Sequence, residues 1–95
     1  MRLISQNGKI DVPYEKVILG ICDQNNGQEY VIYAYHDSPR PLFIATYSNT
    51  DKALKVMEML RDEYLQYCTA RSNEYWFAFN NPKVFKFPKD EEVEV

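Results

Sequence analysis

The sequence predicts an α+β fold, in which about six or seven strands form a mainly antiparallel sheet of hairpins and a meander, and one long amphipathic helix packs on it. Two observations lead to this fold class. Short apolar runs separated by turn residues are typical of strands, and they flank a single stretch with helical periodicity at about residues 49–69. Runs of strands with one late helix favour an α+β domain over an alternating α/β fold.

Length and charge indicate a single domain. The chain has 95 residues, enough for one core and too few for two. We expect one domain over residues 1–89, followed by an acidic C-terminal tail over residues 90–95 (DEEVEV). The net charge of -3 comes from this tail, because 11 bases face only 10 of the 14 acids in the rest of the chain. A near-neutral body disfavours nucleic acid as a partner, and so polar a tail is expected to stay solvated.

The first element is expected to be a β-hairpin. Asn7-Gly8 separates residues 2–6 from residues 9–12, and Asn-Gly is the strongest short signal for a type I′ turn, in which both central residues have positive φ. Pro13 has no N–H to donate, so the second strand ends there or lies on an edge.

A three-stranded meander is expected next. Its strands are residues 17–22, residues 29–36 and Leu42–Tyr47, which are rich in β-branched and aromatic residues. The cluster DQNNGQ at residues 23–28 predicts the first turn. Two prolines in DSPRP, residues 37–41, exclude helix and strand pairing and predict a stiff loop.

The helix is predicted from one apolar face that repeats with a helical period. Ser48 or Asn49 can cap its first turn, and Asp51 stands where a capping box has its acid. The residues of the apolar face are Ala53, Val56, Met57, Leu60, Tyr64, Tyr67 and Cys68. The charged residues expected to be solvated are Lys52, Lys55, Glu58, Asp62 and Glu63. After the helix, residues 75–79 and 84–87 are expected to form a C-terminal hairpin.

Two expected strands are apolar on both faces, which is the main indication of function. In residues 29–36, Tyr30, Ile32, Ala34 and His36 form one face, and Val31, Tyr33 and Tyr35 form the other. Residues 75–79 (YWFAF) have no polar face either. An antiparallel sheet with one solvated face should alternate apolar and polar residues, and one helix covers only one face. Candidate ligand or interface residues are therefore Tyr33, Tyr35, Arg40, Trp76, Phe85 and Phe87.

We expect a homo-oligomer to cover the second face, most simply a dimer, because closed two-fold assemblies are the commonest. Whether the N-terminal hairpin swaps between subunits stays open.

No catalytic or cofactor motif accompanies these strands, so an enzyme is not expected. Cys22, His36 and Asp37 are the residues that could form a thiol site if the fold brought them together. Two cysteines without CxxC spacing predict neither a disulfide nor a zinc site, so we expect free thiols, no metal and no cofactor in a reducing cytoplasm. The N-terminal segment lacks the apolar region of a signal peptide, and no apolar stretch approaches the ~20 residues of a membrane-spanning helix.

Arg40 supports an alternative function. It stands between Pro39 and Pro41, so its guanidinium has little entropy to lose and could grip a carboxylate or phosphate. With Tyr33, Tyr35 or Trp76 it would form a pocket for a nucleotide-like small ligand. Aromatic strands can also stack the bases of single-stranded nucleic acid, but the positive charge of such surfaces is missing here.

The opening segment MRLISQNGKIDVPYE resembles the start of a group of small uncharacterised proteins of Firmicutes bacteria and their phages and prophages. The segment IATYSNTDKALKVM and the closing FKFP before the acidic terminus are similar to later parts of the same group. The resemblance covers residues 1–15, residues 44–60 and the tail. It implies a small accessory protein that binds a host or phage component, without catalytic residues to carry over. We therefore expect a non-enzymatic phage- or prophage-type protein that acts by binding.

Overall fold

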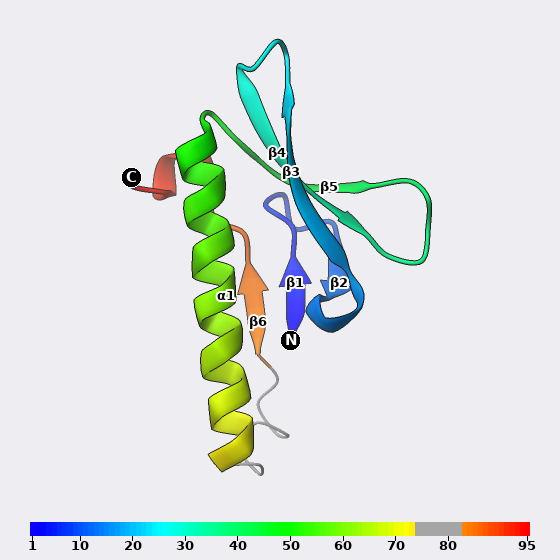
Figure 1. Cartoon of the computed structure of the whole chain (residues 1–95), viewed down its shortest axis with the longest axis vertical. Helices are drawn as coiled ribbons and strands as arrows, with labels where there is room; N and C mark the ends of the chain where they lie inside the picture. Colours follow the sequence, from blue (N-terminus) through cyan, green and yellow to red (C-terminus); the bar gives the residue numbers. More distant parts are fainter. Residues whose placement is uncertain (74–82) are drawn as a thin grey trace.

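A computed structural model describes residues 1–73 and 83–95 of the chain (Figure 1). Within these described residues, one helix and six strands form the framework, together with two short 3₁₀ turns at Tyr14–Lys16 and Asp90–Glu92. The elements are β1 (Arg2–Ile4), β2 (Asp11–Pro13), β3 (Ile18–Gln24), β4 (Glu29–Tyr35), β5 (Leu42–Tyr47), α1 (Thr50–Asn73) and β6 (Val84–Lys86). The α+β class is confirmed.

The strands form two small sheets, so the expectation of one sheet of six or seven strands is wrong. One sheet has the order β2-β1-β6 and the other has the order β3-β4-β5. All neighbours are antiparallel except β1 and β6, which are parallel. The division falls after Pro13, where the chain leaves the first hairpin through the 3₁₀ turn and cannot continue the same ladder into β3.

The N-terminal hairpin is confirmed, but its turn differs from the expected type I′. The Gly8 N–H donates to the Ser5 carbonyl at 2.9 Å, and the Ser5 N–H donates to the Ile10 carbonyl at 2.8 Å. Gly8 has φ 78°, whereas Asn7 is not among the positive-φ residues of the described chain. The Asn7 side chain instead accepts from the Lys9 N–H at 2.9 Å. This geometry corresponds to a longer hairpin loop that needs glycine at one position only.

The helix begins and packs as its sequence pattern predicts, and it ends four residues later than expected. Asn49 is the cap, because its Oδ1 accepts from the Lys52 N–H at 2.8 Å. Ala53, Val56 and Leu60 are fully buried, and Met57, Tyr64 and Tyr67 are half-buried. Cys68, expected on the apolar face, is exposed.

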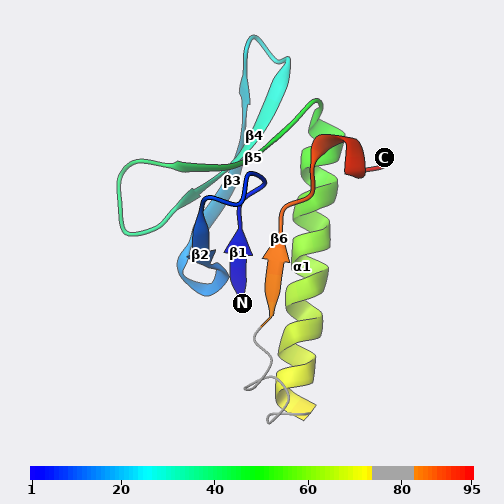
Figure 2. The same cartoon turned by 180° about the vertical axis from the view of Figure 1, so that it is seen from behind.

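One core joins the helix to both sheets, and α1 runs alongside β6 (Figures 1 and 2). Leu3 pairs with Phe85 across the parallel β1–β6 contact, and both side chains are buried. Phe87 is also buried, and its ring meets that of Phe85 edge-on with centroids 5.2 Å apart. Phe85 and Phe87 are therefore core residues rather than exposed interface residues, because β6 lies under the helix. Trp76 and the rest of the expected strand 75–79 lie outside the described residues.

Candidate functional site

The face of the β3-β4-β5 sheet that points away from the core is the candidate functional surface, and we call it the outer face. Strand register fixes its members, because Gly20 pairs with Tyr33, Tyr33 pairs with Phe43, and residues directly opposite share a face. The outer face consists of Ile18, Gly20, Cys22, Gln24, Glu29, Val31, Tyr33, Tyr35, Phe43 and Thr46. A bulge between Ile32 and Tyr33 shifts β5 relative to β4 at this point.

The outer face is mostly apolar around Tyr33 and is partly open to solvent, although Val31 within it is buried. Ile18 is 72% exposed and Phe43 is 49% exposed, while Tyr33 and Tyr35 are half-buried. The opposite face of β4 is closed, because Ile32 and Ala34 are fully buried in the core. The surplus of apolar area expected from the sequence therefore exists on the outer face, and the helix leaves it uncovered.

The two central tyrosines are held in place by their neighbours. The Tyr33 and Tyr35 rings meet edge-on at 84° with centroids 5.6 Å apart. Tyr33 lies across Gly20 on the adjacent strand, at a distance where a side chain at position 20 would collide with its hydroxyl end. The absence of a side chain at Gly20 thus lets the ring cover β3. A pre-positioned ring loses little side-chain entropy when a partner docks on it.

Arg40 does not form the expected pocket with these tyrosines. It is exposed in the loop between β4 and β5, where its N–H donates to the Ser38 Oγ at 3.2 Å. This loop projects beyond the body of the molecule (Figures 1 and 2). Within residues 1–73 and 83–95, Arg40 makes no ion pair and no contact with an aromatic ring.

The possible thiol site is not assembled. Cys22 pairs with Val31, and His36 follows Val31 by five positions along an extended strand, roughly 16 Å away. His36 Nε2 lies 3.7 Å from its sequence neighbour Asp37 Oδ2. The part of the chain that the structure describes holds no group of three or more His, Cys, Asp or Glu side chains arranged for a metal ion.

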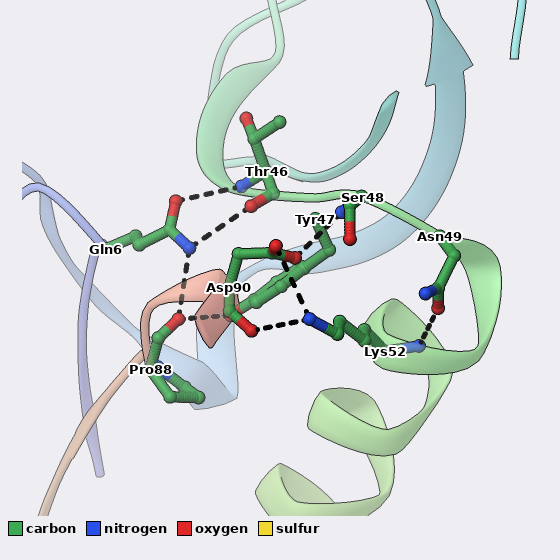
Figure 3. A network of polar contacts seen from close by, with 8 residues as sticks. All are labelled: Gln6, Thr46, Tyr47, Ser48, Asn49, Lys52, Pro88 and Asp90. Atoms are coloured by element: carbon green, nitrogen blue, oxygen red, sulfur yellow. Dashed lines mark hydrogen bonds and ion pairs between the residues drawn. The ribbon is translucent and has the colours of Figure 1, made fainter. Parts of the chain in front are cut away.

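A second cluster of polar contacts joins the hairpin, β5, the helix start and the C-terminal segment (Figure 3). The Gln6 side chain accepts from the Thr46 N–H at 3.1 Å and donates to the carbonyls of Thr46 and Pro88 at 3.2 and 3.1 Å. The Tyr47 hydroxyl donates to the same Pro88 carbonyl at 2.7 Å. Burial, reinforced by the negative charges of Asp90 and Glu92, raises the pKa of Tyr47, so the hydroxyl stays protonated and keeps donating.

The same cluster shows that the expectation of a solvated acidic tail is wrong for Asp90 and Val93, whereas Glu91 and Glu92 are exposed. Asp90 Oδ1 accepts from the Ser48 N–H at 2.8 Å, and Asp90 Oδ2 lies 3.4 Å from Lys52 Nζ. Val93 is buried in the core. Val93 and the paired carboxylate of Asp90 thus dock the segment against the start of the helix, where negative charge is favourable.

We expect Asp90→Asn to destabilise the protein by about 1 kcal/mol at neutral pH, because the carboxylate is a charged acceptor that is partly exposed. The hydrogen bond from Ser48 lowers the pKa of Asp90 below its usual 3.8, so its contribution exists above that value and disappears as the pH falls through the lowered pKa. Thermal unfolding of both proteins from pH 7 to pH 2 measures this. The curves should converge only in acid, and a constant difference across the whole range would contradict the assignment.

Sequence reasoning identified Tyr33 and Tyr35 but missed Ile18 and Phe43, the most exposed apolar residues of the outer face. Their strands were predicted, yet their common face follows only from the pairing of β3 and β5 with β4. No helix in the described part of the chain is long and apolar enough to cross a membrane. No protein-family model, curated protein or solved structure matches the chain.

Proposed function

We propose that this chain is a non-enzymatic binding protein whose outer face docks a protein partner. The observation that carries the proposal is the pair of exposed apolar residues, Ile18 and Phe43, on either side of the edge-on rings of Tyr33 and Tyr35. Contiguous apolar patches on a small protein mark interaction sites, and tyrosine is enriched where such sites bury a ring while keeping its hydroxyl hydrated.

The composition of this surface favours a protein partner over nucleic acid. The only charged residue among the ten of the outer face is the acid Glu29, so the face supplies no lysine or arginine for the phosphate contacts that dominate nucleic-acid affinity. Apolar and aromatic anchors near the centre of a contact instead provide most of the energy of protein interfaces.

The resemblance of residues 1–15 and 44–60 to small phage and prophage proteins supports the biological setting of this proposal. We propose an accessory role in a bacterial cytoplasm, exerted on a host or phage protein. A homo-oligomer belongs to the same proposal, since closed two-fold assemblies are the commonest and two joined outer faces offer a partner a larger surface than one.

Affinity purification from a Firmicutes lysate, with this protein as the bait, tests the binding function. The variant Phe43→Ser is compared with the control variant Val84→Ser. The two positions have similar exposure, 49% and 52%, but Val84 lies on the other sheet. We expect a specific protein retained by the wild type and by Val84→Ser, and about tenfold less of it on Phe43→Ser. Equal retention by both variants would contradict the proposal. A small molecule that is extracted from the wild type and absent from Arg40→Ala would support the alternative ligand-binding function instead.

A further inference from the structure

The two edge strands of the β3-β4-β5 sheet differ in whether other residues bond to their outward backbone groups. The β5 edge is covered, because the Gln6 N–H donates to the Ile44 carbonyl at 2.9 Å and the Gln6 side chain bonds both backbone groups of Thr46. The β3 edge has no such cover. Among the described residues, no hydrogen bond reaches the outward backbone groups of residues 18–22.

Residues 18–22 of β3 lack the usual protection of an edge strand, and the one charge of the strand, Asp23, stands near its end. Natural edges carry a lysine, a proline, a bulge or an inward charge that prevents pairing with another chain. Residues 18–22 (ILGIC) contain no charge and no proline, and their pairing with β4 is regular from Ile18 to Gln24. The edge is therefore able to accept another strand.

Apolar side chains flank this edge on both faces of the sheet. Ile18 is exposed on the outer face. On the helix side, an open groove of about 340 Å³ lies between the strand and the start of α1, and exposed Leu54 forms part of its wall. Its lining residues are Ile21, Cys22, Asp23, Tyr30, Thr50 and Leu54. An added strand would find hydrogen-bonding groups at the edge and apolar contacts above and below it.

We propose that the β3 edge pairs with β3 of a second copy, antiparallel about a two-fold axis at Gly20, and merges the two three-stranded sheets into one of six strands. This inference rests on the proposed function and specifies how the homo-oligomer forms. Because such an axis is perpendicular to the sheet, both outer faces lie on the same side and become one continuous docking surface.

The register follows from the residues that face each other. Centring on Gly20 places Ile18 opposite Cys22 of the second copy and Leu19 opposite Ile21 of the second copy, so both pairs are apolar. In the register centred on Gly20, Asp23 stands opposite Val17, which precedes β3. A shift by one residue at the axis places Asp23 opposite Leu19 inside the strand in one direction and opposite Glu15 in the other. An unpaired charge against an apolar residue, or two like charges, is unfavourable in such a pair.

Charge also favours antiparallel over parallel association of the two copies. Lys16 precedes the apolar run and Asp23 follows it, and both side chains are exposed. Parallel in-register pairing would place Lys16 against Lys16 and Asp23 against Asp23 of the second copy. The antiparallel register instead places Lys16 opposite Gln24 and Asp23 opposite Val17, so it avoids both like-charge pairs. Glu15, which neighbours Lys16, is neutralised within its own chain by the Met1 amine at 2.7 Å.

Light scattering and sedimentation on the full chain test the assembly, with two lysine substitutions on the same outer face. Ile18→Lys places a charge at the edge, and Phe43→Lys places it on β5, two strands away. The wild type should have twice the 11.3 kDa mass of one chain. Ile18→Lys should raise the dimer dissociation constant by about tenfold or more, while Phe43→Lys should leave it nearly unchanged.

Each other outcome overturns the edge pairing. A wild type that remains monomeric at high concentration excludes it, and so does a dimer that persists in Ile18→Lys. Equal dissociation by both variants would show that the copies bury their outer faces against each other. Loss of partner retention in Phe43→Ser with the dimer intact separates the docking function from the dimer, so either proposal can fail alone.

A cross-link tests the register directly. In a Cys68→Ser background, Ile18→Cys places a thiol opposite Cys22 of the second copy, and opposed residues of antiparallel strands are about 4.5–5.5 Å apart, within disulfide range. Mild oxidation should give a covalent dimer, and a reducing agent should cleave the disulfide bond that joins its two copies. Phe43→Cys in the same background is the control and should stay uncross-linked. A cross-link in the control alone would overturn the proposed register.

Discussion

Phe87→Ala should lower the free energy of unfolding by about 3–5 kcal/mol, the usual cost of removing a large aromatic side chain from a core. Phe87 is 1% exposed and packs edge-on against Phe85 beneath the helix. Truncation therefore leaves a cavity between the helix and the β2-β1-β6 sheet, and it also removes a favourable ring contact. Because small domains are stable by only about 5–15 kcal/mol, the variant should unfold at a much lower temperature or fail to fold.

Urea unfolding measures this effect, and Val84→Ala provides the matched control. Val84 lies three residues earlier, at the start of β6, but is 52% exposed, so its truncation should cost less than about 1 kcal/mol. Similar losses for both variants would mean that β6 contributes through its backbone pairing with β1 rather than through the buried ring. Phe87→Leu should recover part of the loss, because it refills much of the cavity.

Elements defined by local patterns were predictable from the sequence. The strand Leu42–Tyr47 has the bounds that its composition predicts, and Asn49 caps a helix whose buried residues Ala53, Val56 and Leu60 recur at the expected spacing. These features depend on residues a few positions apart, where periodicity and capping chemistry carry most of the information.

Features that depend on long-range pairing were not predictable in the same way. The sequence shows that residues 84–87 favour a strand, but its parallel partner β1 lies at the other end of the chain. That pairing buries Phe85 and Phe87, which the sequence alone placed among the exposed candidates. The bulge that sets Phe43 opposite Tyr33 likewise cannot be predicted from the order of apolar and polar residues, although it determines which rings share the outer face.

The C-terminal segment gave the largest difference between expectation and structure. Acidic residues dominate positions 90–95, and composition favours a solvated tail. The composition of a segment does not show the positions of its individual residues. Docking of this segment depends on the positions of one valine and one carboxylate. Val93 reaches the core, and Asp90 reaches the start of the helix beside Ser48.

Deletion of residues 90–95 should therefore destabilise the protein by about 2–3 kcal/mol, from the lost burial of Val93 and the lost charged hydrogen bond of Asp90. For a domain of this size, such a loss lowers the melting temperature by about 10 °C or more. Deletion of residues 94–95 alone should leave it nearly unchanged, because both residues are exposed. Calorimetry of the two truncated chains beside the wild type measures the difference.

A pair of identical substitutions separates burial from the loss of chain length. Val93 is 6% exposed and Val95 is 71% exposed, two residues apart in the same segment. Val93→Ser places a hydroxyl in the core and should cost about 1–2 kcal/mol, while Val95→Ser changes only solvated surface and should be neutral. If both substitutions were neutral while the deletion of residues 90–95 still destabilised the protein, the docking of the segment would depend on Asp90 and its contacts with Ser48 and Lys52 rather than on the valine.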